Sequence, residues 1–301
     1  MAIVLGKNQY GKAEVRLVHV DRSTPRHVIT DVNVTSQLIG DFAETHLTGA
    51  NDRVIATDTQ KNTVYALARI GGVRTIEEFA LRLARNYVGT YDWVTGARME
   101  IEQTFWDRIQ TAAGPHDHSF VKAGAEVRTT VVRKDGDVET VISGLENVVV
   151  LKSTGSEFWG FPDVPYTSLV ETDDRIMATS VTARWRYAVD LDLDSADWDG
   201  LFSSVRSLML EKFATLHSLA LQQTLYAMGQ VVLETHPEIA EVRLSCPNKH
   251  HFLVDLSAWD LDNPQQVYYA ADRPYGLIEA SVIRDDQPEP AGVWEGINGF
   301  V

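Results

Sequence analysis

A threonine and an aspartate follow one another where an apolar run gives way to a helical pattern. Val54-Ile55-Ala56 is apolar, and Thr57 and Asp58 come directly before residues 59–69, whose spacing predicts a helix. A hydroxyl, a carboxylate and the unpaired N–H groups of a helix start could bind a polar ligand within one turn of chain. The competing interpretation is a helix N-cap, the usual role of Thr or Asp at such a position.

Two cations stand at the starts of predicted strands. Lys12 follows the flexible Gly11. A lysine there is usually solvated, but desolvation would lower its pKa and let it act as a base. Arg175 carries a planar guanidinium that suits a flat acceptor with two polar atoms. Because residues 171–174 include three acids, a salt bridge is the competing interpretation for Arg175.

A Gly/Ser-rich stretch at 151–161 contains three aromatic residues within four positions, Phe158, Trp159 and Phe161. Exposed aromatic rings carry a hydrophobic cost, so these rings need a partner. They either anchor the loop to the core or offer a flat ligand a ring on which to stack.

Residues 246–252 resemble a strand, in which Asn248 and His250 share one face. An amide beside an imidazole is more typical of a site than of a core. Histidines at 116, 118, 250 and 251 could ligate a metal, but no Cys pair or His-Glu-x-x-His pattern accompanies them. We therefore expect no metal. Since dinucleotide, phosphate-loop and nucleophile-elbow motifs are also absent, we expect no cofactor.

Composition narrows the classes further. The 301 residues carry a net charge of −15, which opposes binding to nucleic acid and to anionic membranes. No apolar run reaches the roughly 18 residues that span a bilayer. The single cysteine, Cys246, excludes an intramolecular disulfide and suits a reducing cytoplasm. The length favours two domains of about 150 residues.

The elements that must position these residues follow one order twice. Period-two alternation predicts strands, helical spacing predicts helices, and Thr75-x-x-Glu78 is a capping box. The predicted elements are strands around 12–17 and 28–34, helices at 59–69 and 75–89, strands at 98–108, 123–133, 138–151 and 177–187, one bent helix or two helices at 198–235, and strands at 243–257 and 276–284.

We therefore predict an α+β fold with two tandem ββααββ domains, 1–136 and 137–301. Each would be a four-stranded antiparallel sheet with helices on one face. Such sheets have two exposed edges, which invite pairing with another copy of the chain. Asp, Pro and Gly are frequent after about residue 285 and predict an extended or mobile tail.

Taken together, these segments resemble the urate oxidase (uricase) family. The resemblance rests on motifs whose order and spacing agree up to about Arg284. They are Tyr10-Gly11-Lys12, Ala56-Thr57-Asp58, Lys61-Asn62, Pro115-x-His-x-Phe120 around His118-Ser119, Leu151-Lys152-Ser153-Thr154, Phe158-Trp159-Gly160-Phe161, Asp174-Arg175-Ile176 and Pro247-Asn248-Lys249-His250.

The resemblance implies tandem tunnelling-fold (T-fold) domains in a homotetramer whose sheets close into a barrel around a tunnel. It implies oxidation of urate by O2 and water to 5-hydroxyisourate and hydrogen peroxide, with no metal or organic cofactor. The site would lie between two subunits. One subunit would supply the substrate-binding residues Phe158, Leu169, Arg175, Leu221, Gln222 and Asn248, and its neighbour would supply Lys12, Thr57 and Asp58, with His250 completing a proton relay.

Each position has an implied role. Arg175 and Gln222 would grip one edge of the anion, and Phe158 would stack on its ring. Thr57 and Asp58 would contact the opposite edge through hydroxyl and backbone amide. Lys12 would deprotonate Thr57, His250 would keep the relay connected, and Asn248 with Thr57 would hold a water or O2 above the ring.

Two details differ from the family pattern. Leu221 replaces the usual valine, and the C-terminal Asn298-Gly299-Phe300-Val301 is not a peroxisomal tripeptide, which suggests a bacterial, cytoplasmic protein. The alternatives are another T-fold enzyme acting on a purine or pterin, such as a cyclohydrolase or aldolase relative, and a purine-binding protein without catalysis. A cyclohydrolase would need zinc or a comparable metal.

Overall fold

The computed structural model describes residues 1–271, 273–297 and 300. The predicted absence of a targeting tripeptide therefore falls on residues largely outside the described part of the chain. The fold divides into two compact units. The first comprises Met1–Gly144, Val189–Asp199 and Glu289–Val293, and the second comprises Leu145–Ala188, Gly200–Pro288 and Trp294–Val301. The boundary predicted after residue 136 lies at a turn between two strands, and the domain limits stay a prediction.

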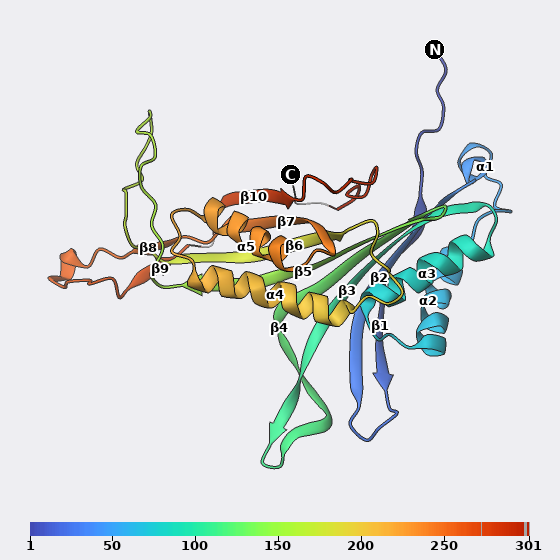
Figure 1. Cartoon of the computed structure of the whole chain (residues 1–301), viewed down its shortest axis with the longest axis horizontal. Coiled ribbons are helices and arrows are strands. Elements are labelled where there is room, and N and C mark those ends of the chain that lie inside the picture. Colours follow the sequence, from blue (N-terminus) through green and yellow to red (C-terminus); the bar gives the residue numbers. More distant parts are fainter. Residues whose placement is uncertain (272, 298–299, 301) are drawn as a thin grey trace. The chain divides into compact units, whose positions relative to one another are not determined.

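The first unit places two helices against an antiparallel sheet. Its elements are β1 (Tyr10–Asp21), β2 (Val28–Gly40), α1 (Ala43–Leu47), α2 (Thr57–Gly71), α3 (Ile76–Thr90), β3 (Val94–Thr111), β4 (Gly114–Asp135) and the start of β5 (Val138–Lys152). Strands β1 to β4 pair in sequence order. Helix α3 packs on β3 and β4, and α2 packs on β1. The β1–β2 hairpin and the β3–β4 hairpin both extend past α2 and α3 (Figure 1).

One half of the predicted capping box is confirmed at the start of α3, the side-chain cap by Thr75, while the carboxylate of Glu78 accepts from Arg74. Thr75 is the N-cap, and its Oγ1 accepts a hydrogen bond from the backbone N–H of Glu78 at 3.3 Å. The helix then buries one face, including Phe79, Leu83 and Tyr87. Helix α1 was not predicted, because five residues are too few to show helical periodicity.

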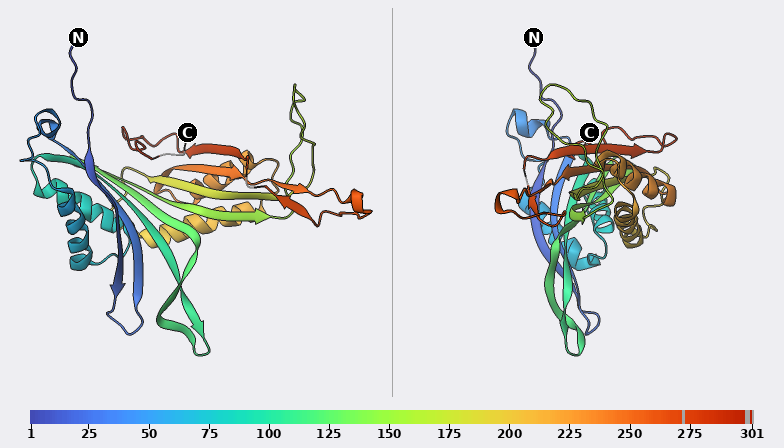
Figure 2. Two further views of the ribbon diagram at one scale, coloured as in Figure 1. Left: turned by 180° about the vertical axis from the view of Figure 1, so that it is seen from behind. Right: turned by 90° about the vertical axis from the view of Figure 1, so that its left-hand side faces the viewer.

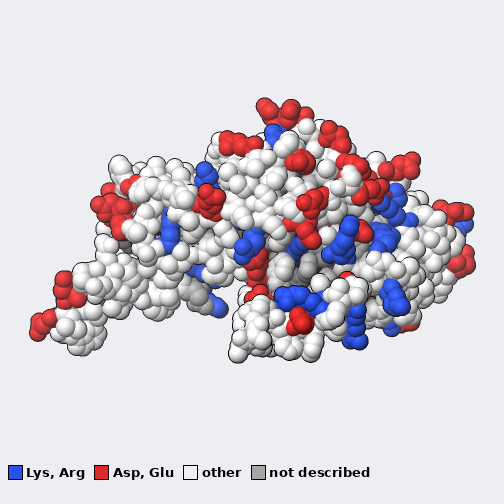
Figure 3. All heavy atoms as spheres, turned by 60° about the horizontal axis from the view of Figure 1, so that its bottom comes forward, with Lys and Arg blue, Asp and Glu red and all other residues white. Residues whose placement is uncertain are grey.

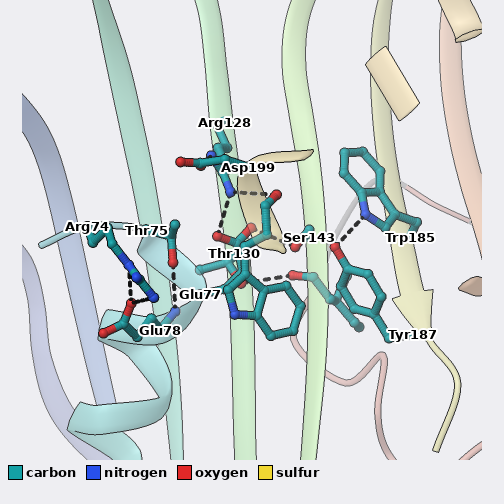
Figure 4. Close-up of polar contacts among 12 residues, drawn as sticks. Arg74, Thr75, Glu77, Glu78, Arg128, Thr130, Ser143, Trp185, Tyr187 and Asp199 are labelled. Carbon is teal, nitrogen blue, oxygen red and sulfur yellow. Dashed lines mark hydrogen bonds and ion pairs between the residues drawn. The ribbon is translucent and has the colours of Figure 1, made fainter. Parts of the chain in front are cut away.

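A buried ionic network joins α3 to the sheet (Figure 4). Glu77 accepts hydrogen bonds from Arg128 of β4 at 2.8 Å and from Ser143 of β5 at 2.7 Å. Arg128 also bonds Asp199 and the carbonyl of Trp198. Burial raises the pKa of Glu77, while the charge of Arg128 acts in the opposite direction. Because Glu77 bonds side chains of both β4 and β5, the network fixes how α3 lies on its strands.

The second unit repeats the order of elements. It contains the rest of β5, β6 (Met177–Tyr187), most of α4 (Trp198–Thr215), α5 (Leu221–Thr235), β7 (Ile239–Asn248), β8 (His251–Leu253), the 3-10 helix η1 (Ser257–Trp259), β9 (Tyr268–Ala270) and β10 (Gly276–Ile283). The sheet order is β5-β6-β7-β10, and α5 packs on β7 and β10. The β8–β9 hairpin projects from this sheet (Figure 2).

The duplicated ββααββ pattern is therefore confirmed, with β8 and β9 as an insertion that was not predicted. The stretch 198–235 forms two helices rather than one bent helix. Between them, Ser218 donates from its Oγ to the carbonyl of Ala220 at 3.0 Å and pairs with the hydroxyl of Thr224 at 2.6 Å. These bonds satisfy polar groups at the start of α5.

The segment after β10 makes specific contacts. Trp294 donates from Nε1 to Glu241 at 3.0 Å, and the guanidinium of Arg243 lies 4.1 Å from the centre of the Trp294 ring. Whether the segment is mobile stays a prediction.

Acidic residues outnumber basic ones by 42 to 27. On the face drawn in Figure 3, basic side chains lie among acidic ones. Among the described residues, no helix is both long and apolar enough to cross a membrane.

Candidate active site

The residues singled out from the sequence belong to different units. Lys12, Thr57 and Asp58 lie in the first unit, and the remaining seven lie in the second. Each group is held by its own set of backbone contacts. The two groups are therefore best described as two half-sites.

Lys12 lies on β1 between a close approach to β2 at Gly11 and a β-bulge that follows. A Cβ added to Gly11 would meet the carbonyl oxygen of Ser36 at 1.7 Å, so only glycine allows this approach. The pairing of β1 with β2 shifts between Lys12 and Val15, and Glu14 adopts a φ of 56°. The alternation predicted for residues 12–17 is therefore wrong at this point, because the bulge redirects the side chains.

Thr57 is the first residue of α2, and the N-cap expected at the Thr-Asp pair is wrong. The N-cap is Ala56, without a side-chain cap, and Thr57 is exposed. The first intrahelical bond runs from the N–H of Gln60 to the carbonyl of Ala56. The N–H groups of residues 57–59 thus have no partner within α2, as expected for a first turn.

The carboxylate of Asp58 is engaged with its own helix. It accepts hydrogen bonds from the ammonium of Lys61 and, at 3.0 Å, from the amide of Asn62. Lys61 is the main cause of a lowered pKa for Asp58, and the charge of Lys12 adds to it. Asp58 therefore has its backbone N–H rather than its carboxylate to offer a ligand.

In the second unit, backbone bonds on both sides hold Phe158. Its N–H and carbonyl both bond Thr172, at 2.9 and 3.1 Å. Just before Phe158, the N–H of Glu157 donates to the carbonyl of Ser218, and the N–H of Ser218 donates to the carbonyl of Gly155. Gly155 has a φ of 71°, which favours glycine and so explains the flexible residue in this loop. The rings of Phe158 and Phe161 stack at 5.2 Å.

Arg175 has no carboxylate partner among the described residues. The competing interpretation, a salt bridge to its acidic neighbours, is therefore wrong for the described residues; Asp174 instead accepts from Thr154, and Glu171 accepts from the N–H of Gly160. The guanidinium lies 5.1 Å from the centre of the Phe158 ring, and its Nε is buried without a hydrogen-bond partner. Burial lowers the pKa of Arg175. A half-buried cation in this state favours an anionic ligand.

Leu221 and Gln222 are the first two residues of α5. Leu221 is 2% exposed, so its side chain belongs to the core and its backbone N–H is what it can present. Gln222 is exposed, whereas Gln223 accepts from the N–H of Leu219 at 2.8 Å. The start of α5, with the exposed amide of Gln222 beside it, suits an anion.

Asn248 ends β7, where it pairs with Thr179 of β6 and Gly276 of β10. The strand predicted through His250 is wrong, because β7 stops at Asn248 and His250 lies in the link to β8. Burial lowers the pKa of His250, and the positive charges of Arg175 and His251 lower it further. His250 therefore lies in the electrostatic field of Arg175, in the same half-site.

Leu169 lies in the loop after Phe161 and is 55% exposed. No contact places it beside Arg175 within the described chain. In the described part of the chain, no group of three or more His, Cys, Asp or Glu side chains is arranged to hold a metal ion.

Two residues of the first half-site were not singled out from the sequence. Tyr10 and Gln60 bond the backbone just before Thr57. Tyr10 has no separate signal in the sequence beyond its place in the Tyr10-Gly11-Lys12 motif. Gln60 carried a signal in its spacing, since it shares the buried face of α2 with Val64 and Ala68.

Tandem ββααββ units define this chain as a T-fold protein. The family model described as "Uricase" matches residues 8–133 and 141–279. A uricase of Arthrobacter globiformis is 56% identical over 298 residues, which are 99% of this chain and 96% of that protein. A uricase of Dictyostelium discoideum is 36% identical over 92% of this chain and 96% of that protein.

Solved structures agree with the sequence matches. The crystal structure of the Arthrobacter globiformis uricase has a TM-score of 0.92 and covers 98% of this chain and 99% of that one. Urate oxidase from Bacillus sp. TB-90 is only 22% identical but shares the fold, with a TM-score of 0.81 over 92% of this chain and 100% of that one. The chain belongs to the uricase family.

Proposed function

We propose that this protein oxidises urate with O2 and water to 5-hydroxyisourate and hydrogen peroxide, in purine degradation. Membership of the uricase family supports the activity. The observation that carries the site is that the half-buried guanidinium of Arg175 lies next to the ring of Phe158 and has no carboxylate partner in the described part of the chain. Urate is a flat anion and needs both a charge partner and a stacking surface.

The second half-site binds the substrate. Arg175 and Gln222 grip one edge of urate, the start of α5 with Leu221 adds backbone donors, and Phe158 stacks on the ring. Phe158 already stacks with the ring of Phe161, the same kind of contact that it would make with a flat ligand. Leu169, in the exposed loop, covers the substrate once it is bound.

The first half-site, together with His250 and Asn248 of the second, moves protons and holds O2. Lys12 deprotonates Thr57, whose hydroxyl relays a proton from urate or the peroxide, and His250 extends the relay. Asn248 and Thr57 hold O2 or water above the ring. Electron-rich urate dianion reduces O2 directly, so the protein supplies position and charge and needs no cofactor.

The active site is shared between subunits of a homotetramer. This proposal rests on the division of the candidate residues between two units and on the family resemblance. The outer strands β1 and β10 each pair on one side only within the described chain, which leaves edges free for pairing into a tunnel-forming barrel. We place the enzyme in the cytoplasm.

The test follows the loss of urate absorbance and the release of peroxide by metal-free purified protein. Equal amounts of urate consumed and peroxide formed support the proposal. Urate binding without turnover would indicate a binding protein. Activity on another purine or a pterin, restored only by added zinc, would indicate the alternative T-fold enzyme.

A further inference from the structure

Gln60 is a fully buried amide at the base of the first half-site. We propose that Gln60, together with Tyr10, is a positioning residue that sets the distance between Lys12 and Thr57. The inference rests on the proposed function, because it concerns the proton transfer between those two side chains. Neither Gln60 nor Tyr10 touches substrate in this proposal.

The amide of Gln60 connects the two segments that carry the proton-transfer pair. The residue is 0% exposed. Its Oε1 accepts from the hydroxyl of Ser36 at 2.9 Å, and Ser36 is the partner of Lys12 in the pairing of β1 with β2. Its Nε2 donates to the carbonyl of Ile55, two residues before Thr57, at 3.3 Å. One side chain thus joins the strand position opposite Lys12 to the chain that leads into Thr57.

Tyr10 makes the second connection. Its hydroxyl accepts from the N–H of Ile55 at 2.8 Å and donates to the carbonyl of the same residue at 3.2 Å. Tyr10 precedes Lys12 by two residues on β1, and its ring packs edge-on against Phe42 at 4.7 Å. Ile55 is therefore held from β1 by Tyr10 and from α2 by Gln60.

A further bond restrains Gln60 itself. The hydroxyl of Tyr87, on the buried face of α3, donates to the backbone carbonyl of Gln60 at 3.1 Å. The network lies beneath two side chains that need this support, since Thr57 is exposed in a first helical turn and Lys12 stands at a bulge. Proton transfer requires heavy atoms within hydrogen-bond reach, and a displacement of about 1 Å can cost about a hundredfold in rate. The network is placed to prevent such a displacement.

The test compares Gln60→Leu with Val64→Ala, a matched change on the same buried face of α2. Gln60→Leu removes both amide hydrogen bonds and keeps a side chain of similar volume. We expect kcat for urate to fall about ten- to a hundredfold with KM changed less than about threefold. Val64→Ala should lower the melting temperature but leave kcat within about threefold. Tyr10→Phe should act like Gln60→Leu, and it serves if Gln60→Leu does not fold.

A double-mutant cycle separates positioning from general damage. In a Lys12→Met background, Gln60→Leu should reduce kcat by less than about threefold, since the pair it positions is already broken. Multiplicative losses in Lys12→Met/Gln60→Leu would overturn the proposal, as would a Gln60→Leu enzyme that behaves like Val64→Ala. If Lys12→Met itself keeps full kcat, the assigned role of Lys12 fails first. That result is distinguishable, because the single Lys12 variant reveals it.

Discussion

The guanidinium of Arg175 lies 5.1 Å from the centre of the Phe158 ring, and the backbone N–H of Arg175 bonds the carbonyl of Ser156 at 2.8 Å. The ring and the cation are therefore set by the same loop, so one segment orients both the stacking surface and the charge.

Arg175→Ala should abolish measurable urate binding, because a half-buried anion would lose its charge partner. Arg175→Lys should restore part of the affinity, since an ammonium keeps the charge but not the planar fork. Equilibrium binding of urate or a xanthine inhibitor measures the effect. Arg74→Ala is the matched control, because Arg74 pairs with Glu78 at the surface. Near-normal affinity in Arg175→Ala would contradict the assignment.

Thr57→Ala should lower kcat at least about a hundredfold while KM changes little, because the hydroxyl acts in proton transfer. Since Ala56 is the N-cap, the substitution should change the melting temperature little. Thr57→Ser should recover activity, and Thr59→Ala should resemble the parent protein. Equal losses in kcat and affinity would make Thr57 a binding group instead.

The pH dependence of kcat should show an acid limb set by His250. Burial lowers its pKa below the ordinary 6.5, and the charges of Arg175 and His251 add to the effect. The imidazole therefore gains its proton at a lower pH than an ordinary histidine does. His251→Asn removes one positive neighbour, so it should raise the pKa of His250 and move the acid limb to higher pH. His217→Asn, whose partner is Glu157, should leave the limb in place; a shift in both variants would exclude this origin.

Glu77→Ala should destabilise the fold by about 3–5 kcal/mol, because it removes the buried one of the two carboxylates that pair with the buried Arg128, the other being the exposed Asp199. Glu78→Ala removes an exposed pair one position later and should cost no more than about 1 kcal/mol. Urea unfolding followed by circular dichroism measures both. Equal midpoints for the two variants would contradict a structural role for the network.

Local patterns were enough to predict the order of the longer elements and most of the candidate residues. The N-cap at Thr75 and the break between α4 and α5 at Ser218 both depend on residues close in sequence. Spacing predicted the N-cap, but it left open whether residues 198–235 form one helix or two. The β1 bulge was beyond prediction, since it depends on how Gly11 approaches Ser36 of another strand.

Long-range contacts also decide which functional interpretation holds. Three adjacent acids predict a salt bridge to Arg175, which the described residues do not form; two of these acids bond Thr154 and Gly160 instead. Likewise, the end of β7 at Asn248 depends on pairing with both neighbouring strands, which alternation along one segment does not encode.

The contact of Gly11 with the Ser36 carbonyl has a consequence for protein engineering. A randomised library around Lys12 that includes position 11 would devote most of its members to chains whose first hairpin cannot close, since any side chain there meets the backbone. Variation aimed at altered substrate choice should therefore keep this glycine fixed and sample Gln222 and Leu169, which are exposed and belong to the other half-site.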